Sequence, residues 1–137
     1  MRRVVRARSL PSSRPVRITS APPGAIIATA ALVGDAEEPG AHFELLLRMR
    51  DPRGGVPHLP ERFIPAAERF QLSVRIDREV VRLALERLEA QPDAAANVAL
   101  CAINLSAAAL MDDGFVGFVA QRLHRSVFPA ERLCFEM

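Results

Sequence analysis

The stretch that decides the fold is FELLLRMRD, residues 43–51, in which a carboxylate and a guanidinium lie inside an apolar run. Side chains of a β-strand alternate between its two faces, so Glu44, Leu46 and Arg48 share one face, and the other face is continuously apolar. Charged side chains are rarely buried unless they are paired or bind a metal or ligand. The stretch therefore has two interpretations. It is an edge strand with a solvated charged face, or a strand whose Glu44 holds a cation and whose Arg48 holds a phosphate.

The 137 residues suit a single domain, and half of them are hydrophobic, which is enough for a sizeable core. All 18 basic residues are arginine, and six of them precede the first acidic residue, Asp35. No apolar run approaches the ~20 residues of a membrane span, and no secretory signal is apparent. Cys101 and Cys134 are far apart and lack the spacing of metal ligands. We therefore expect a cytoplasmic protein with reduced, structural cysteines.

Residues 1–24 are rich in arginine, proline and serine and have no apolar periodicity, so we expect a disordered arm. An arginine-rich arm is able to contact nucleic acid or an acidic surface. A solvated tail or a linker remnant is the simpler interpretation, and nucleic acid is not an expected partner.

Residues 25–137 alternate between predicted strands and predicted helices. The predicted strands are 25–33, 43–51, 97–106 and 133–137. The predicted helices are 60–70, 77–90 with Asp77 as its N-cap, and 112–127. Residues 34–40 are predicted as a turn, so the first two strands form a hairpin or lie side by side, and 91–96 is predicted as a loop. Apolar strands separated by helices are typical of a parallel α/β sheet or barrel.

Three of these strands carry a polar residue inside or at the end of an apolar run, namely Glu44, Asn104 and Glu136. In parallel α/β folds, functional residues gather at the carboxyl ends of the strands. Two carboxylates and an amide oxygen are hard ligands that suit Mg²⁺ or Mn²⁺. The pattern therefore indicates a metal site, although scattered carboxylates also produce such a trio by chance.

Five motifs, in order, resemble those of EAL-domain cyclic-di-GMP phosphodiesterases. ELLLR at 44–48 resembles the family's Glu-Ala-Leu-Leu-Arg signature, with Leu45 in place of Ala. The other four are FIPAAE at 63–68, IDR at 76–78, INLS at 103–106 and LCFE at 133–136. Their common order and spacing from about residue 41 to 136 make the resemblance specific, because a lone Glu-Leu-Leu would carry no weight.

The resemblance implies a TIM-like (β/α) barrel that hydrolyses one phosphodiester of cyclic-di-GMP to the linear dinucleotide, using Mg²⁺ or Mn²⁺. It implies that Glu44, Asn104 and Glu136 are metal ligands. It also implies that the substrate-binding residues are Arg48, Leu46 and Pro65.

The chain also departs from the family pattern. Family members continue beyond the position of Met137 with an Asp-Asp metal motif and a catalytic lysine, and this sequence has no lysine. A Gln-Pro ligand motif would fall near residues 29–30 and is missing. We therefore expect residues 25–137 to be the N-terminal half of an EAL domain, about the first four strands of the barrel with their helices, and to be inactive alone.

Two alternatives to this expectation remain open. The chain is a degenerate cyclic-di-GMP-binding or protein-interaction module, or it is a gene fragment without activity. A half-barrel exposes a strand edge and one face of its sheet, which predicts marginal stability or a homo-oligomer.

Overall fold

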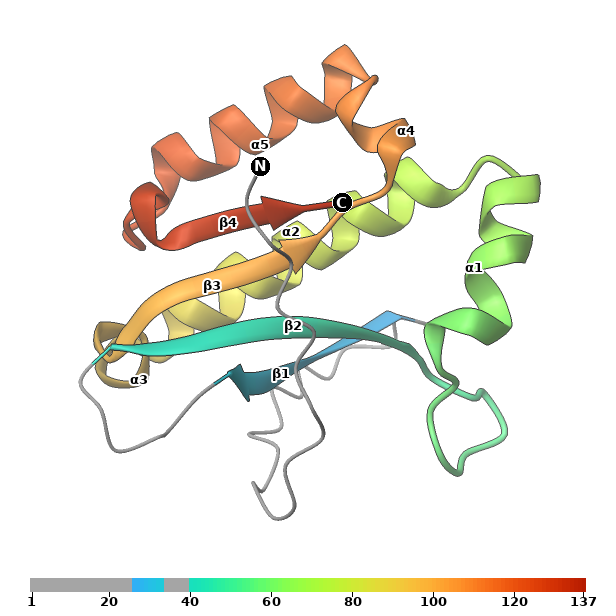
Figure 1. Cartoon of the computed structure of the whole chain (residues 1–137), viewed down its shortest axis with the longest axis horizontal. Helices are drawn as coiled ribbons and strands as arrows, with labels where there is room; N and C mark the ends of the chain where they lie inside the picture. Colours follow the sequence, from blue (N-terminus) through green and yellow to red (C-terminus); the bar gives the residue numbers. More distant parts are fainter. Residues whose placement is uncertain (1–25, 34–39) are drawn as a thin grey trace.

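A computed structural model describes the backbone of residues 26–33 and the backbone and side chains of residues 40–137 (Figure 1). The predicted arm at 1–24 and most of the predicted turn at 34–40 lie outside the described residues. In the described part of the chain, no helix combines the length and apolar character needed to cross a bilayer.

Four strands form one sheet in the order β1-β2-β3-β4. They are β1 (Ile26–Val33), β2 (Ala41–Met49), β3 (Val98–Asn104) and β4 (Leu133–Glu136). β2, β3 and β4 are mutually parallel, whereas β1 pairs with β2 in the antiparallel direction. The hairpin prediction is therefore confirmed, and a wholly parallel sheet is wrong at β1. The reason is the length of the connection, because parallel neighbours need a crossover of a dozen residues or more and β1 and β2 are too close in sequence for one.

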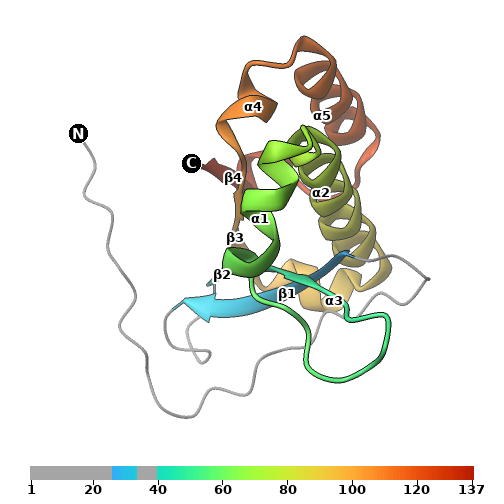
Figure 2. The same cartoon turned by 90° about the vertical axis from the view of Figure 1, so that its right-hand side faces the viewer.

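The helices lie mainly on one side of this sheet, as the edge-on view in Figure 2 shows for α2 and α5. They are α1 (Pro60–Arg69), α2 (Ser73–Ala90), α3 (Pro92–Ala96), α4 (Ala107–Leu110) and α5 (Asp113–Arg125), with a 3₁₀ turn η1 (Ala130–Arg132) before β4. The β2-to-β3 and β3-to-β4 connections each contain a long helix, which is the arrangement that joins parallel strands.

Two of the local predictions are wrong. Asp77 does not cap α2, because the helix already begins at Ser73. Asp77 lies within the first turns of α2 and is buried, at 6% exposure. Gln71, with φ of 55°, lies in the short turn between α1 and α2. Because α2 begins directly after this turn, it starts about one helical turn before Asp77, the predicted first residue. Residues 91–96 are not a loop, because Pro92 opens the short helix α3.

The core lies between the helices and the apolar face of the sheet. Ile103 and Leu85 are fully buried, and Cys101, Leu45 and Phe115 are nearly so. Full burial of such side chains contributes about 1.5–3 kcal/mol each relative to exposure. The same strand faces that the alternation predicts as apolar therefore hold the sheet against α2 and α5.

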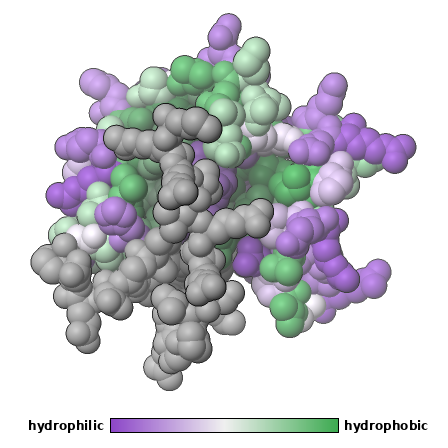
Figure 3. Space-filling model, viewed as in Figure 1, coloured by the Kyte–Doolittle hydropathy of each residue, from purple (hydrophilic) through white to green (hydrophobic). Residues whose placement is uncertain are grey.

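Apolar side chains also reach the surface where α4 meets α5. Met111 is 87% exposed and Leu110 is 43% exposed. Figure 3 shows apolar residues in the upper part of the view, where these helices lie, with hydrophilic residues toward the left and right margins.

Candidate functional site

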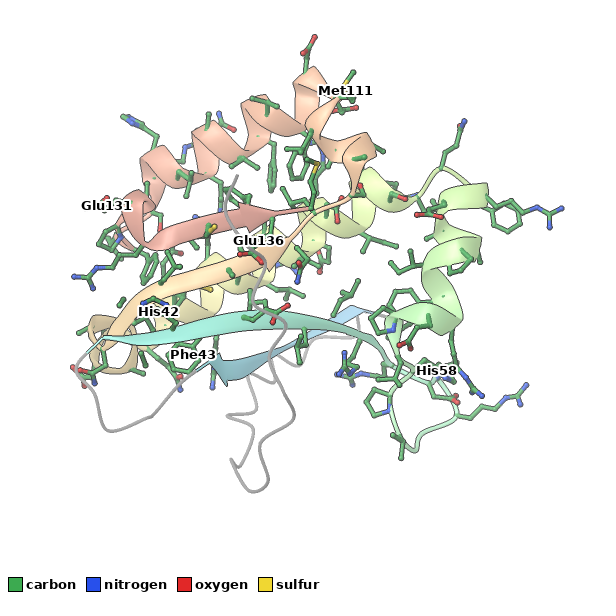
Figure 4. All side chains as sticks on the ribbon, in the orientation of Figure 1. His42, Phe43, His58, Met111, Glu131 and Glu136 are labelled. Carbon is green, nitrogen blue, oxygen red and sulfur yellow. The ribbon has the colours of Figure 1, made fainter. Side chains whose placement is uncertain are left out.

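The candidate site lies on the face of the sheet that points away from α2 and α5. Pairing places Glu44 beside Ala102, and Asn104 beside Glu136. Because the neighbours Leu45, Ile103 and Leu105 of these residues are buried in the helix-covered core, the polar residues project to the opposite face. Figure 4 labels Glu136 near the end of β4, in the view that looks onto this face.

Glu44 and Asn104 are in direct contact although they are 60 residues apart in sequence. The Asn104 Nδ2 donates a hydrogen bond of 2.9 Å to the Glu44 Oε1. Asn104 is exposed and Glu44 is half-buried, so both side chains can be reached from solvent. The contact shows that β2 and β3 bring the Glu44 carboxylate and the Asn104 amide together.

Glu136 is the backbone neighbour of this pair. Its Cα is the register partner of Asn104, and its carbonyl oxygen accepts a 2.8 Å hydrogen bond from the Leu105 N–H. The Glu136 side chain is exposed. Among the described residues, no three His, Cys, Asp or Glu side chains are close enough to form a metal cluster. The structure thus brings the Glu44 and Asn104 side chains together and places the Glu136 backbone beside Asn104. The carboxylate and amide oxygens of these three residues are hard donors of the kind that Mg²⁺ and Mn²⁺ prefer.

The predicted substrate-binding residues are divided between two elements. Arg48 and Leu46 lie on β2, on the same face as Glu44, and both are half-buried. The Arg48 Nη1 donates to the Leu47 carbonyl at 2.6 Å, which uses one of its five N–H donors. Pro65 lies within α1 and is exposed.

His58, which the sequence did not single out, closes the loop between β2 and α1 by bonding to Met49 at the end of β2. Met49 and His58 exchange two backbone hydrogen bonds of 3.1 and 2.8 Å, and the His58 Nε2 lies 3.3 Å from the Asp51 Oδ2. Figure 4 labels His58 in this loop, below α1. The loop therefore leads directly from the end of β2 to the start of α1. No local pattern predicts this closure, because a histidine in a loop has no periodic signal.

The sequence also gave no indication that Asp77 lies next to the candidate site. Its carboxylate accepts hydrogen bonds from Ser106, two residues after Asn104. Burial raises the pKa of Asp77 above its usual value, although the bonds from Ser106 act in the opposite direction. This long-range contact joins α2 to the end of β3, and sequence spacing gives no indication of it.

A separate hollow of about 80 Å³ lies on the helix-covered side of the sheet. Its lining is mainly apolar and includes Leu45, Leu88 and Cys101. The Arg87 Nε at its edge is buried, and no described group bonds to it. Since Leu45 and Glu44 point to opposite faces of β2, this hollow is separate from the polar trio.

Solved structures of EAL domains share this fold. The PaMucR phosphodiesterase, solved as a c-di-GMP complex, superposes with a TM-score of 0.67 at 27% identity, over 82% of this chain and 46% of that one. The FimX EAL domain from Pseudomonas aeruginosa, bound to c-di-GMP, gives a TM-score of 0.62 at 24% identity, over 81% of this chain and 43% of that one. The EAL enzyme Bd1971 gives 0.68 at 18% identity, over 82% and 32%. The architecture is therefore an α/β fold that resembles part of an EAL domain.

Curated sequences agree with the structural likeness. Cyclic di-GMP phosphodiesterase PdeB of Shewanella oneidensis is 36% identical over 95 residues, which is 69% of this chain and 11% of PdeB. The uncharacterized protein Mb1389c of Mycobacterium bovis is 37% identical over 95 residues, which is 69% of this chain and 15% of that protein. The chain thus spans a small part of the length of these relatives.

The family model for the EAL domain matches residues 32–137, which include all five of the motifs between β2 and β4. The chain belongs to the EAL domain family.

Proposed function

We propose that this chain supplies part of a metal-dependent cyclic-di-GMP phosphodiesterase site, in which Glu44, Asn104 and Glu136 hold Mg²⁺ or Mn²⁺. The observation that carries the proposal is the 2.9 Å contact between the Glu44 and Asn104 side chains on neighbouring parallel strands. Two relatives, PdeB and PaMucR, are described as phosphodiesterases, which supports the reaction class.

The chemistry assigned to each residue follows from its donor atoms. A bound divalent cation would lower the pKa of a water molecule and offset negative charge on the phosphoryl oxygens. The carboxylates of Glu44 and Glu136 and the amide oxygen of Asn104 would bind and orient it. In the described structure the Asn104 NH₂ group already bonds to Glu44, so the Asn104 Oδ1 is turned away from that bond.

Arg48 is the proposed phosphate-binding residue. It lies on the same face of β2 as Glu44 and carries a guanidinium whose planar set of donors matches phosphate oxygens. Leu46, between them on that face, is proposed to contact the ligand through its apolar side chain. Pro65 is proposed to bound the ligand from α1, on the strength of the family resemblance.

For a polypeptide of these 137 residues we propose binding without turnover. The sequence has no lysine, whereas the family resemblance implies a catalytic lysine. We also propose that residues 25–137 are the folded domain and that residues 1–24 are an arm outside it.

The test compares Glu44→Gln with Glu131→Gln. Both changes remove one negative charge, but Glu131 is exposed in η1, at the opposite end of β4 from Glu136 (Figure 4). Calorimetric titration with MnCl₂, and then with cyclic-di-GMP in the presence of Mn²⁺, measures both affinities. We expect Glu44→Gln to weaken Mn²⁺ binding at least about tenfold and Glu131→Gln to leave it unchanged.

Three results would contradict the proposal. Equal Mn²⁺ affinity in the wild type and Glu44→Gln would remove Glu44 from the metal site. Cyclic-di-GMP binding that does not depend on Mn²⁺ or on Arg48 would remove the substrate assignment. Chromatographic detection of the linear dinucleotide would show turnover and refute the proposal that the 137 residues bind without hydrolysis.

A further inference from the structure

Asp77 is a buried carboxylate placed directly behind the candidate site. It belongs to α2, one turn after the start of that helix, and its side chain is 6% exposed. A buried carboxylate is costly unless its oxygens are hydrogen-bonded. Here one oxygen, Oδ2, accepts both the Ser106 backbone N–H at 3.0 Å and the Ser106 hydroxyl at 2.5 Å. Both bonds therefore go to a residue that lies two positions after Asn104.

The Ser106 hydroxyl has a second role that fixes its orientation. Its oxygen accepts the Ala109 N–H at 3.2 Å and so caps the short helix α4. Because the single hydroxyl proton is directed to Asp77, the lone pairs face Ala109, and the two bonds do not compete. The turn from β3 into α4 is thereby held by one carboxylate from another helix.

The three residues at the end of β3 are each attached to a different element. The Asn104 side chain bonds to Glu44 on β2, the Leu105 N–H bonds to the Glu136 carbonyl on β4, and Ser106 bonds to Asp77 on α2. Leu105 is also buried in the core at 8% exposure. Only Leu105 separates Asn104 from Ser106 in the chain. A shift of Ser106 would therefore rotate the backbone that carries Asn104.

We propose that Asp77 is a positioning residue that, through Ser106, sets the orientation of the Asn104 side chain toward Glu44. Asp77 itself does not reach the face that holds Glu44, Asn104 and Glu136. The consequence for metal binding rests on the proposed function, whereas the consequence for the Asn104 amide does not.

The experiment follows the side-chain amide of Asn104 by NMR. The chain has two asparagines and three glutamines, so the side-chain NH₂ region of a ¹⁵N spectrum contains few signals to assign. Glu44→Ala, which removes the acceptor, provides the reference position for an unbonded Asn104 amide. The test variants are Asp77→Ala and Ser106→Ala, and Asp77→Asn is the conservative variant because its amide oxygen can still accept from Ser106.

We expect Asp77→Ala and Ser106→Ala to move the Asn104 NH₂ signals toward those of Glu44→Ala, and Asp77→Asn to restore part of the shift. The matched control is Glu89→Gln, which alters another carboxylate of α2 that bonds to a different element, Arg122 of α5. This control is expected to leave the Asn104 signals in place even where it lowers the melting temperature. Mn²⁺ affinity should fall about tenfold in Ser106→Ala and not in Glu89→Gln, the size typical for loss of a group that supports a metal ligand.

Unchanged Asn104 signals in a folded Asp77→Ala or Ser106→Ala variant would overturn the proposal, as would an equal shift in Glu89→Gln. If Asp77→Ala does not fold, Ser106→Ala decides, since it retains the buried carboxylate and the backbone donor. If the wild type binds no Mn²⁺, the proposed metal site is wrong, and the amide signals still decide whether Asp77 positions Asn104.

Discussion

Asp112 shows how a single side chain sets the start of an element. Its Oδ1 accepts the Phe115 N–H at 2.6 Å, as the N-cap of α5, and lies 3.8 Å from the Arg78 Nη2. The Arg78 guanidinium in turn lies over the Phe118 ring at 5.2 Å. The cap thus places α5 against α2 as well as starting it, and Phe115, the first residue it orders, is 2% exposed.

Replacing Asp112 by alanine should destabilise the chain by about 1 kcal/mol, because an orphan N–H at the helix start loses its acceptor. Chemical denaturation of the variant and of Asp113→Ala measures the difference. Asp113 is the neighbouring exposed residue in the first turn of α5, so its replacement should cost only a few tenths of a kcal/mol. Equal losses in the two variants would show that the cap bond does not matter.

Leu45 is where the sequence departs from the family signature, and the structure places this residue away from the polar site. The side chain is 4% exposed and packs in the core on the helix-covered face, next to Leu85 and Ile103 in the same cluster. It does not reach the face of Glu44. A larger apolar residue at this position therefore changes the packing of the core rather than the polar site.

At the scale of elements, a salt bridge with two hydrogen bonds, between Glu89 of α2 and Arg122 of α5, joins these two helices. The Arg122 Nη1 and Nη2 donate to the two oxygens of Glu89 at 3.2 and 2.9 Å. The two side chains are 21% and 25% exposed, so water screens the pair only in part. The bonds from Arg122 hold the pKa of Glu89 below its usual value near 4.5.

A carboxylate with a lowered pKa in the folded state adds stability above its unfolded pKa, and this contribution disappears as pH falls through the folded pKa. Glu89→Gln should therefore lower the free energy of unfolding by about 0.5 kcal/mol at pH 7, and the difference from the wild type should shrink as pH falls through the lowered, folded-state pKa of Glu89. Denaturation at pH 7 and pH 3.5 tests this expectation. Glu68→Gln, on the exposed side of α1, is the control, and a difference that is as large at pH 3.5 as at pH 7 would contradict the assignment.

At the scale of the whole molecule, β4 is an edge strand of the sheet, with β3 as its one partner among the described strands. Edge strands carry backbone donors and acceptors that can pair with another chain. Leu133 and Phe135 on β4 pack against the core but are only half-buried. We therefore expect the 137-residue chain to self-associate through this edge.

Light scattering coupled to gel filtration, over a range of concentrations, measures this association. Cys134 pairs in register with Ala102 and so faces the same side of the sheet as Glu44, and Cys134→Arg places a charge on the edge strand. This variant should shift the mass toward the monomer. Met111→Arg, at an exposed position between α4 and α5, should not. A wild type that is monomeric at all concentrations and melts sharply would contradict the prediction.

Much of the fold follows from local pattern. The alternation within 43–51 predicts which side chains of β2 face the core, and Cys101 and Ile103 on β3 are buried as their spacing requires. The start of α5 follows from Asp112, since a cap acts on the N–H groups of the next three residues. The contact between Glu44 and Asn104 was foreseeable, because the face of each strand and the parallel order of the strands together bring them to one side of the sheet.

What the sequence by itself determined was therefore the four strands, the three longer helices α1, α2 and α5, their buried faces and the polar residues that share a surface. Tertiary structure alone decided the closure of the loop by His58 and the burial of Asp77 against Ser106. The physical reason is the range of the interactions. Periodicity and capping act within a few residues, whereas the partner of Asp77 is 29 residues away in sequence and becomes its neighbour only when α2 packs against the end of β3.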